Sequence, residues 1–86
     1  MKQFTYPITD PMGIHARPAG LLVKAAKAVD STVTVVKEDG KSAVAVKLMA
    51  LMGLGIKQGD TVTVTVEGAN EEADFVTMEK FFQENL

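Results

Sequence analysis

The sequence contains no cysteine and only one histidine, His15. Without thiols the chain can form neither a disulfide nor a thiolate metal site, which fits a reducing compartment. With one imidazole, a zinc site would need several carboxylates as further ligands. We therefore expect a cytoplasmic protein that binds no metal ion and uses no cofactor.

Long apolar runs and an excess of positive charge are also missing. The first ten residues, MKQFTYPITD, lack the apolar stretch of a signal peptide, and no segment approaches the roughly twenty apolar residues of a membrane span. The formal net charge of -2 argues against a nucleic-acid surface, which needs a basic stripe. We therefore expect neither nucleic-acid binding nor membrane insertion. The 86 residues are enough for one core, so we expect a single domain over residues 1–86.

Four segments show the alternation of apolar and polar residues that is typical of β-strands. In the first, KQFTYPI, the side chains of Phe4, Tyr6 and Ile8 share one face. Pro7 has no backbone N–H, which places this strand at a sheet edge. The EDGK segment predicts a hairpin between the second and third strands, since Gly40 tolerates the positive φ of the turn. The strands are expected over residues 2–8, 32–37, 42–46 and 61–66, and the last should bury Val62, Val64 and Val66.

Three segments indicate helices. The first covers residues 16–29, with Lys24 and Lys27 outside its apolar stripe, and the second is the short apolar segment 47–53. The third follows Asn70, which we expect to cap it, and its first turn carries acidic residues that suit the helix dipole. The expected buried stripes are Leu22, Ala25, Ala26 and Val29 in the first helix and Phe75, Met78 and Phe82 in the third. The order β-α-β-β-α-β-α predicts an α+β fold with helices on one face of a sheet.

The segment GIHARPAG, residues 13–20, places His15 at the expected start of the first helix. If His15 is the N-cap, the N–H groups of the first turn have no intrahelical partners, and Pro18 is tolerated there because it has no N–H to lose. These N–H groups attract an anion, and Arg17 adds a planar cation that can bind a phosphate. A neutral imidazole can attack a phosphoryl donor and carry the group covalently.

We expect no general base, no carboxylate pair and no magnesium ligand near His15. Such a site is too sparse for a stand-alone enzyme and suits a carrier whose partner enzymes supply the missing groups. A solvated or capping histidine is the simpler alternative, and Arg17 alone would be an ordinary surface charge. The grouping of His15, Arg17 and Pro18 at one helix start favours a functional site.

GIHARPAG resembles the active-site motif of the HPr family, the histidine-containing phosphocarriers of the bacterial phosphoenolpyruvate-dependent sugar phosphotransferase system. LMALMGLGIKQGD resembles a second characteristic region of that family, and chain length and element order agree over essentially the whole chain. The resemblance implies an open-faced β-sandwich with three helices on one face of a four-stranded antiparallel sheet of order 1-4-2-3. The first strand is then an edge strand, in agreement with Pro7.

The resemblance also implies roles for individual residues. His15 would accept phosphate on Nδ1 from phospho-enzyme I and pass it to sugar-specific IIA domains. Arg17 would stabilise the phosphate, and Ala16 and Pro18 would form the helix start that binds it. The second helix would dock on partner proteins. Its four large apolar side chains could all be core, and for Leu51 we expect this. We expect an exposed docking patch of Leu48, Met49 and Met52, with Gly20, Lys24, Lys27 and Lys47 as further docking residues.

Three positions raise separate questions. Lys47 stands where Gram-positive members carry a regulatory serine that an ATP-dependent kinase phosphorylates, which puts that regulation in doubt here. Met12 stands where many members carry a small polar residue, so the turn before His15 is expected to differ. Gly20 lies inside a helix, where either close packing within the domain or close approach of a partner would explain it.

Three functions are compatible with the sequence. The first is a phosphocarrier, which we expect to be a monomer. The second is a regulatory protein of the same fold that binds a transcription factor or an enzyme through residues 47–53. The third is a structural domain with an incidental histidine. His15 favours the carrier over the second function, and the third leaves the grouping of His15 with Arg17 and Pro18 unexplained. The sequence does not indicate which sugar the pathway transports.

Overall fold

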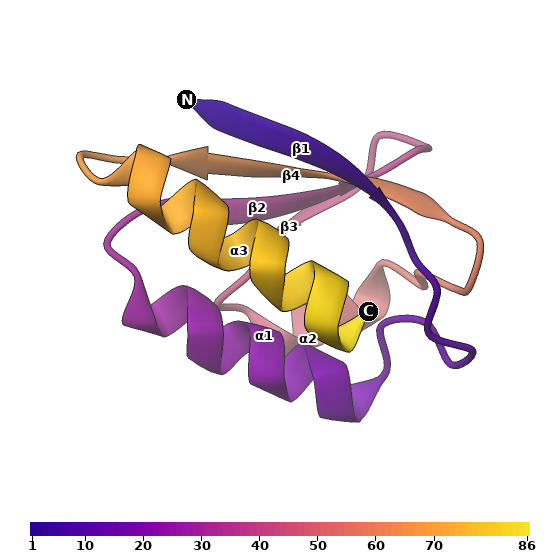
Figure 1. Cartoon of the computed structure of the whole chain (residues 1–86). Helices are drawn as coiled ribbons and strands as arrows, with labels where there is room; N and C mark the ends of the chain where they lie inside the picture. The colour runs from indigo at the N-terminus through magenta and orange to yellow at the C-terminus, as the bar shows by residue number, and fades with distance from the viewer.

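The computed structural model describes residues 1–86. Four strands form one antiparallel sheet in the order β1-β4-β2-β3, and the helices cover one face of it while the other face is open (Figure 1). The predicted architecture and strand order are thus confirmed. Along the chain the elements are β1 (Lys2–Pro7), α1 (Ala16–Ala28), β2 (Thr32–Lys37), β3 (Ser42–Val44), α2 (Leu48–Gly53), β4 (Thr61–Glu67) and α3 (Glu71–Asn85). None of the helices has the length and apolar composition needed to cross a bilayer.

Strand β4 supplies the centre of the core because it lies between β1 and β2. Its residues Val62, Val64 and Val66 are fully buried, and the threonines that alternate with them are half-buried. This is the result of the two-residue repeat of a strand, which sends successive side chains to opposite faces. Strand β1 lies at a sheet edge, as Pro7 predicts, and pairs with β4 alone.

Helices α1 and α3 pack on the sheet through the predicted apolar stripes. Leu22 of α1 and Phe82 of α3 are fully buried. The ring of Phe82 meets those of Phe4 and Tyr6 edge-on, with centroids 5.6 Å and 5.8 Å away. Such edge-to-face pairs stabilise a core beyond the area that they bury. Three predicted stripe residues lie only partly buried at the margin of the core, namely Ala25, Val29 and Phe75.

Five predicted element bounds are wrong, and three of them, the end of β1, the start of α2 and the end of β4, differ by a single residue with no further consequence. Strand β3 stops at Val44 instead of Val46, because the chain turns there and the N–H of Lys47 donates to the Val44 carbonyl at 3.0 Å. Helix α1 stops at Ala28, since Val29 has an extended backbone with φ -101° and ψ 159°. None of these differences moves the start of α1, where His15 lies.

The start of α3 is held by Glu71 and not by a side-chain cap from Asn70. Asn70 occupies the N-cap position, but its amide donates to the Asp30 carboxylate at 2.8 Å and makes no capping hydrogen bond. Glu71 accepts a hydrogen bond from the N–H of Gly68 at 3.2 Å, and its other oxygen lies 2.7 Å from the N-terminal ammonium of Met1. Glu71 therefore joins the start of α3 to the start of the chain.

This contact predicts a pH-dependent contribution to stability. The Met1 ammonium and the Gly68 N–H hold the pKa of Glu71 below its ordinary value of 4.5. A carboxyl with a lowered folded-state pKa stabilises the fold above its unfolded-state pKa, and this contribution is lost as the pH falls through the folded-state value. We expect Glu71→Gln to have a lower urea midpoint than the wild type at neutral pH. In acid, the two midpoints should become equal. Glu72→Gln, at the next residue, is the control. If the difference in urea midpoint between Glu71→Gln and the wild type stays as large in acid, the stabilising role of the Glu71 carboxylate is contradicted.

Candidate functional site

His15 is the N-cap residue of α1, and Ala16 is the first helical residue, as predicted. The backbone of His15 is extended, and its carbonyl accepts the first helical hydrogen bond from the N–H of Ala19 at 2.9 Å. Its side chain makes no capping hydrogen bond and is 35% exposed. The imidazole is therefore reachable from solvent and is not committed to holding the helix.

The first turn of α1 presents free donors beside this ring. The N–H groups of Ala16 and Arg17 have no acceptor within the helix, and none of the hydrogen bonds outside the regular elements uses them. The buried Pro18 starts the helix without adding a further unpaired N–H. The exposed Arg17 guanidinium forms no ion pair within the chain. A small anion can therefore meet two backbone donors and one unpaired cation at this helix end.

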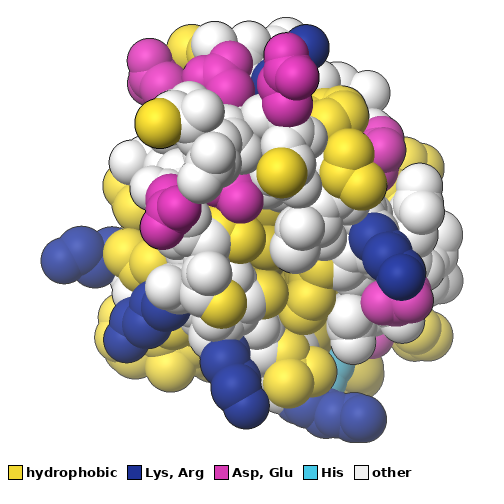
Figure 2. Space-filling view, turned by 60° about the vertical axis from the view of Figure 1, so that its left-hand side comes forward, with side chains coloured by type: hydrophobic (Ala, Val, Ile, Leu, Met, Phe, Trp, Pro, Cys, Tyr) yellow, Lys and Arg dark blue, Asp and Glu magenta, His cyan; other side chains and the backbone are white.

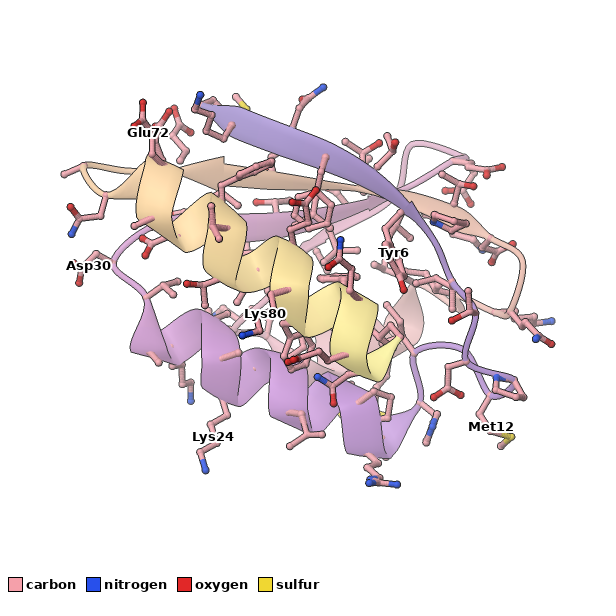
Figure 3. The ribbon with its side chains drawn as sticks, in the orientation of Figure 1. Tyr6, Met12, Lys24, Asp30, Glu72 and Lys80 are labelled. Carbon is pink, nitrogen blue, oxygen red and sulfur yellow. The ribbon has the colours of Figure 1, made fainter.

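Asp10 builds the turn that leads into His15. Its Oδ1 accepts a hydrogen bond from the N–H of Met12 at 2.8 Å, and its carbonyl accepts one from the N–H of Gly13 at 2.9 Å. The same Oδ1 lies 3.8 Å from Nε2 of His15. The side chain of Met12 is 70% exposed and extends away from the fold (Figure 3). The turn is thus held by the Asp10 carboxylate and not by the side chain at position 12.

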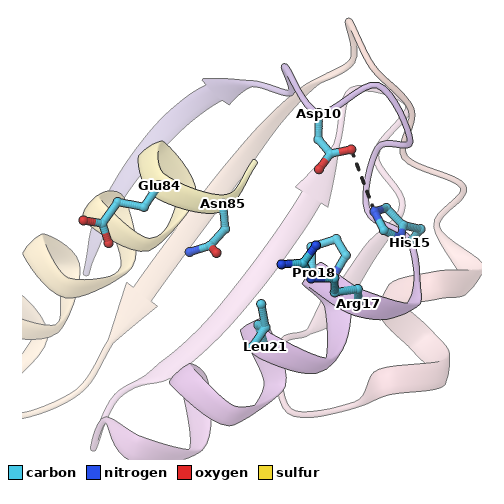
Figure 4. A pocket seen from close by; sticks show the side chains of 7 residues that line it. All are labelled: Asp10, His15, Arg17, Pro18, Leu21, Glu84 and Asn85. Carbon is cyan, nitrogen blue, oxygen red and sulfur yellow. Dashed lines mark ion pairs between the residues drawn. The ribbon is translucent and has the colours of Figure 1, made fainter.

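His15 lies on a hollow of about 160 Å³ between the start of α1 and the end of α3 (Figure 4). The end of α3 is fixed there because the Leu86 carbonyl accepts hydrogen bonds from the N–H groups of Thr9 at 2.6 Å and Asp10 at 2.9 Å. The hollow is smaller than the roughly 300–1,000 Å³ of small-molecule sites, so it suits a small group and not a free sugar or nucleotide. Its lining consists of Asp10, His15, Arg17, Pro18, Leu21, Glu84 and Asn85.

One carboxylate, that of Asp10, lies close to His15, which the sequence did not lead us to expect. Asp10 and Glu84 both line the hollow that contains it. The only signal for Asp10 is its place in the TDPMG turn shortly before His15, and nothing in the sequence connects Glu84 with that turn. Packing of α3 against β1 and α1 brings Glu84 there. No three His, Cys, Asp or Glu side chains cluster in a way that could hold a metal ion.

The predicted docking patch is exposed, and the residue predicted to be core is buried. Met49 is 79% exposed, and Leu48 and Met52 are each 40% exposed, whereas Leu51 is fully buried. Helix α2, which carries the patch, contacts α1. A Cβ added at Gly20 would meet no atom within 4 Å, so close packing within the fold does not explain this glycine.

The lysines predicted to meet partners are all exposed. Lys24 extends from α1 away from the sheet (Figure 3), Lys27 lies on the same helix, and Lys47 is the N-cap residue of α2. Helix α1 carries three basic residues and no acidic one, whereas the first turn of α3 is acidic. Figure 2 shows acidic side chains gathered at the top of the molecule, where α3 begins, and most basic side chains around the middle and lower margins of this face.

Comparisons with known proteins show which family this chain resembles. A family model described as the PTS HPr component phosphorylation site matches residues 2–84. The phosphocarrier protein HPr of Mycoplasma genitalium is 35% identical over 85 residues, which are 99% of this chain and 97% of that protein. A crystal structure of HPr from Thermoanaerobacter tengcongensis superposes with a TM-score of 0.90 at 34% identity, covering 99% of this chain and 94% of that one.

A further solved structure is the catabolite repression protein Crh of Bacillus subtilis, which forms a domain-swapped dimer. Its TM-score is 0.75 at 31% identity, with 100% of this chain and 98% of that chain covered. The fold is therefore shared by carriers and by at least one protein named for regulation. Since the family model and the relatives span nearly all of the sequence, the chain belongs to the HPr family, the phosphocarrier proteins of the sugar phosphotransferase system.

Proposed function

We propose that His15 carries the phosphoryl group on Nδ1 and that Arg17 and the first turn of α1 bind its oxygens. One observation supports this above all: the only imidazole of the chain is partly exposed at a helix N-terminus, beside N–H groups and a guanidinium that have no partner within the chain. Ala16 supplies a backbone donor, and Pro18 fixes the first turn of the helix.

The surrounding charges suit a carrier because they bind phosphate without trapping it. Arg17 attracts the phosphate dianion, while the carboxylates of Asp10 and Glu84 in the same hollow repel it. The lone pair of Nδ1 attacks phosphorus, the bond between phosphorus and the donor breaks, and the donor keeps that electron pair. Onward transfer reverses these steps towards an acceptor. The chain supplies the carrier atom, and its partners supply the remaining catalytic groups, so it is not a stand-alone catalyst.

The test is phosphorylation with purified partners. The protein is incubated with labelled phosphoenolpyruvate and enzyme I, and then with a IIA domain. We expect one label per chain that is labile in acid and stable in alkali, that maps to the peptide containing His15, and that passes to the IIA domain. A chain that binds partners but takes up no label would contradict the carrier function and favour the regulatory one.

We propose that the docking patch of Leu48, Met49 and Met52 forms the apolar part of the surface that meets enzyme I and IIA domains. Methionine side chains are flexible and polarisable, which suits a surface that fits several partners in turn. Gly20 lets a partner approach α1 closely, since nothing within the fold lies over it. The exposed amines of Lys24, Lys27 and Lys47 add attraction for acidic partner surfaces.

Met49→Glu tests this surface. Because Met49 is 79% exposed, the substitution should leave the urea midpoint nearly unchanged. A buried charge at the interface should slow phosphorylation by enzyme I by about tenfold or more, corresponding to at least ~1.4 kcal/mol of lost binding. Val76→Glu is the control, since Val76 is 61% exposed on α3 and lies outside the patch. Unfolding of Met49→Glu, or an unchanged rate, would rule out the docking role.

We further propose that residues 1–86 act as one phosphocarrier domain, as a monomer in the cytoplasm. The lack of cysteine supports a reducing compartment. Size-exclusion chromatography with light scattering tests the monomeric state. A stable dimer, such as the swapped form described for Crh, would contradict it.

A further inference from the structure

We propose that Asp10 is a positioning residue for phosphoryl transfer: its carboxylate keeps the imidazole proton on Nε2 of His15, so that Nδ1 retains the lone pair that attacks phosphorus. This inference rests on the proposed role of His15 as the carrier residue. The observation behind it is the 3.8 Å separation between Oδ1 of Asp10 and Nε2 of His15, on the hollow that both residues line (Figure 4).

The position of Asp10 is fixed independently of His15. Its backbone N–H donates to the Leu86 carbonyl at 2.9 Å, and its own carbonyl accepts from the N–H of Gly13 at 2.9 Å. Its side chain is held by the N–H of Met12, which donates to Oδ1 at 2.8 Å. The end of α3 and the turn before α1 thus determine together where the carboxylate lies. Asp10 presents a preformed negative charge to one particular nitrogen of the ring.

A carboxylate can only accept hydrogen bonds, so it favours the tautomer in which the facing nitrogen carries the proton. The separation of 3.8 Å is too long for a hydrogen bond, and the attraction in the resting protein is therefore modest. A second effect follows from the transfer itself. When the bond from Nδ1 to phosphorus forms and the donor leaves with its electron pair, Nε2 keeps its proton and the ring becomes positive. The Asp10 carboxylate then faces a full charge and stabilises it.

The simpler alternative is that Asp10 only builds the turn, and one substitution separates the two roles. Asp10→Asn keeps an oxygen that can accept from the N–H of Met12 but removes the negative charge. Asp39 provides a matched control in an exposed turn. Its Oδ1 accepts a hydrogen bond at 2.9 Å from the N–H of Lys41, two residues later, just as Asp10 accepts one from Met12. Asp39→Asn changes the net charge by the same amount without touching the residues around His15.

The experiment measures the tautomers of His15 by ¹⁵N NMR at a pH where the ring is neutral, and the rate of labelling by enzyme I. We expect the ratio of the Nε2–H to the Nδ1–H tautomer to fall by about threefold in Asp10→Asn. The effect is modest because the N–H of a neutral imidazole carries only a partial charge, so its attraction to the carboxylate is a fraction of that in a full ion pair. The labelling rate at saturating enzyme I should fall by at least the same factor, with the KM nearly unchanged. Asp39→Asn should match the wild type in both.

The outcomes separate this inference from the proposed function. If Asp10→Asn is labelled at the wild-type rate and shows the wild-type tautomer ratio, Asp10 only builds the turn and the inference is wrong, while His15 remains the carrier. If the wild type takes up no label at His15, the proposed function fails first. A lower labelling rate in Asp10→Asn with an unchanged tautomer ratio would overturn the claim that Asp10 keeps the proton on Nε2, and would leave only its stabilisation of the positive ring during transfer.

Discussion

His15→Ala should lower the rate of phosphoryl transfer from enzyme I by at least about a thousandfold, because the substitution removes the reacting atom. The chain has no other imidazole, so no second residue can form the same adduct. The carboxylates of Asp10 and Glu84 are the other nucleophilic groups of the hollow, and a phosphate on either would be an acyl phosphate that alkali cleaves. Labelling with phosphoenolpyruvate, followed by acid and alkali treatment, therefore distinguishes transfer to His15 from transfer to a neighbour.

The same variant should fold normally. The His15 side chain is 35% exposed and makes no capping hydrogen bond, so its loss should change the free energy of unfolding by less than about 1 kcal/mol. Urea denaturation and circular dichroism check this, and they ensure that the lost transfer is not a folding defect. A well-folded His15→Ala protein that still accumulates acid-labile label would remove His15 from the mechanism.

The fold could be predicted from local patterns because those patterns match the final environment. The valines of β4 alternate and are buried on one side, and Pro7 marks an edge strand that has one neighbour only. The prediction that Asn70 caps α3 is wrong because tertiary contacts override the local preference. Asn70 is a favourable capping residue, yet Asp30 lies within reach of its amide and takes the hydrogen bond. The Met1 ammonium and the Gly68 N–H engage Glu71 instead.

The candidate site could be predicted only in part, for a related reason. The segment that contains His15 and Arg17 is local, so the helix start and its free donors follow from the sequence alone. Glu84 and Asn85 lie at the other end of the chain and reach the hollow through the packing of α3, which no local motif encodes. Asp10 is near in sequence, but its contact with Nε2 depends on the path of the turn, which the hydrogen bonds to Met12 and Gly13 set.

The path of the turn before His15 depends on Gly13. We therefore expect Gly13→Ala to lower both the free energy of unfolding and the rate of phosphoryl transfer. Gly13 has φ +67°, where an added Cβ would lie 2.2 Å from the Ile56 carbonyl oxygen and 2.7 Å from the Lys57 Cα. Both are backbone atoms and cannot rotate away. The Ile56 carbonyl also accepts the N–H of Ile14 at 3.1 Å, a hydrogen bond that the displaced loop would strain. We expect a loss of about 3 kcal/mol, from roughly 1 kcal/mol of left-handed backbone cost and the rest from overpacking.

Gly55→Ala is the matched control for this prediction. Gly55 has nearly the same backbone angle, φ +65°, but an added Cβ there would meet no atom within 4 Å. It should cost only the backbone contribution of about 1 kcal/mol, so the difference between the two variants in urea denaturation isolates the contact with Ile56. Under conditions where Gly13→Ala stays folded, its labelling by enzyme I should also slow, because the loop that orients Asp10 and His15 has moved. Equal destabilisation by the two substitutions would mean that the loop does not lie against Ile56.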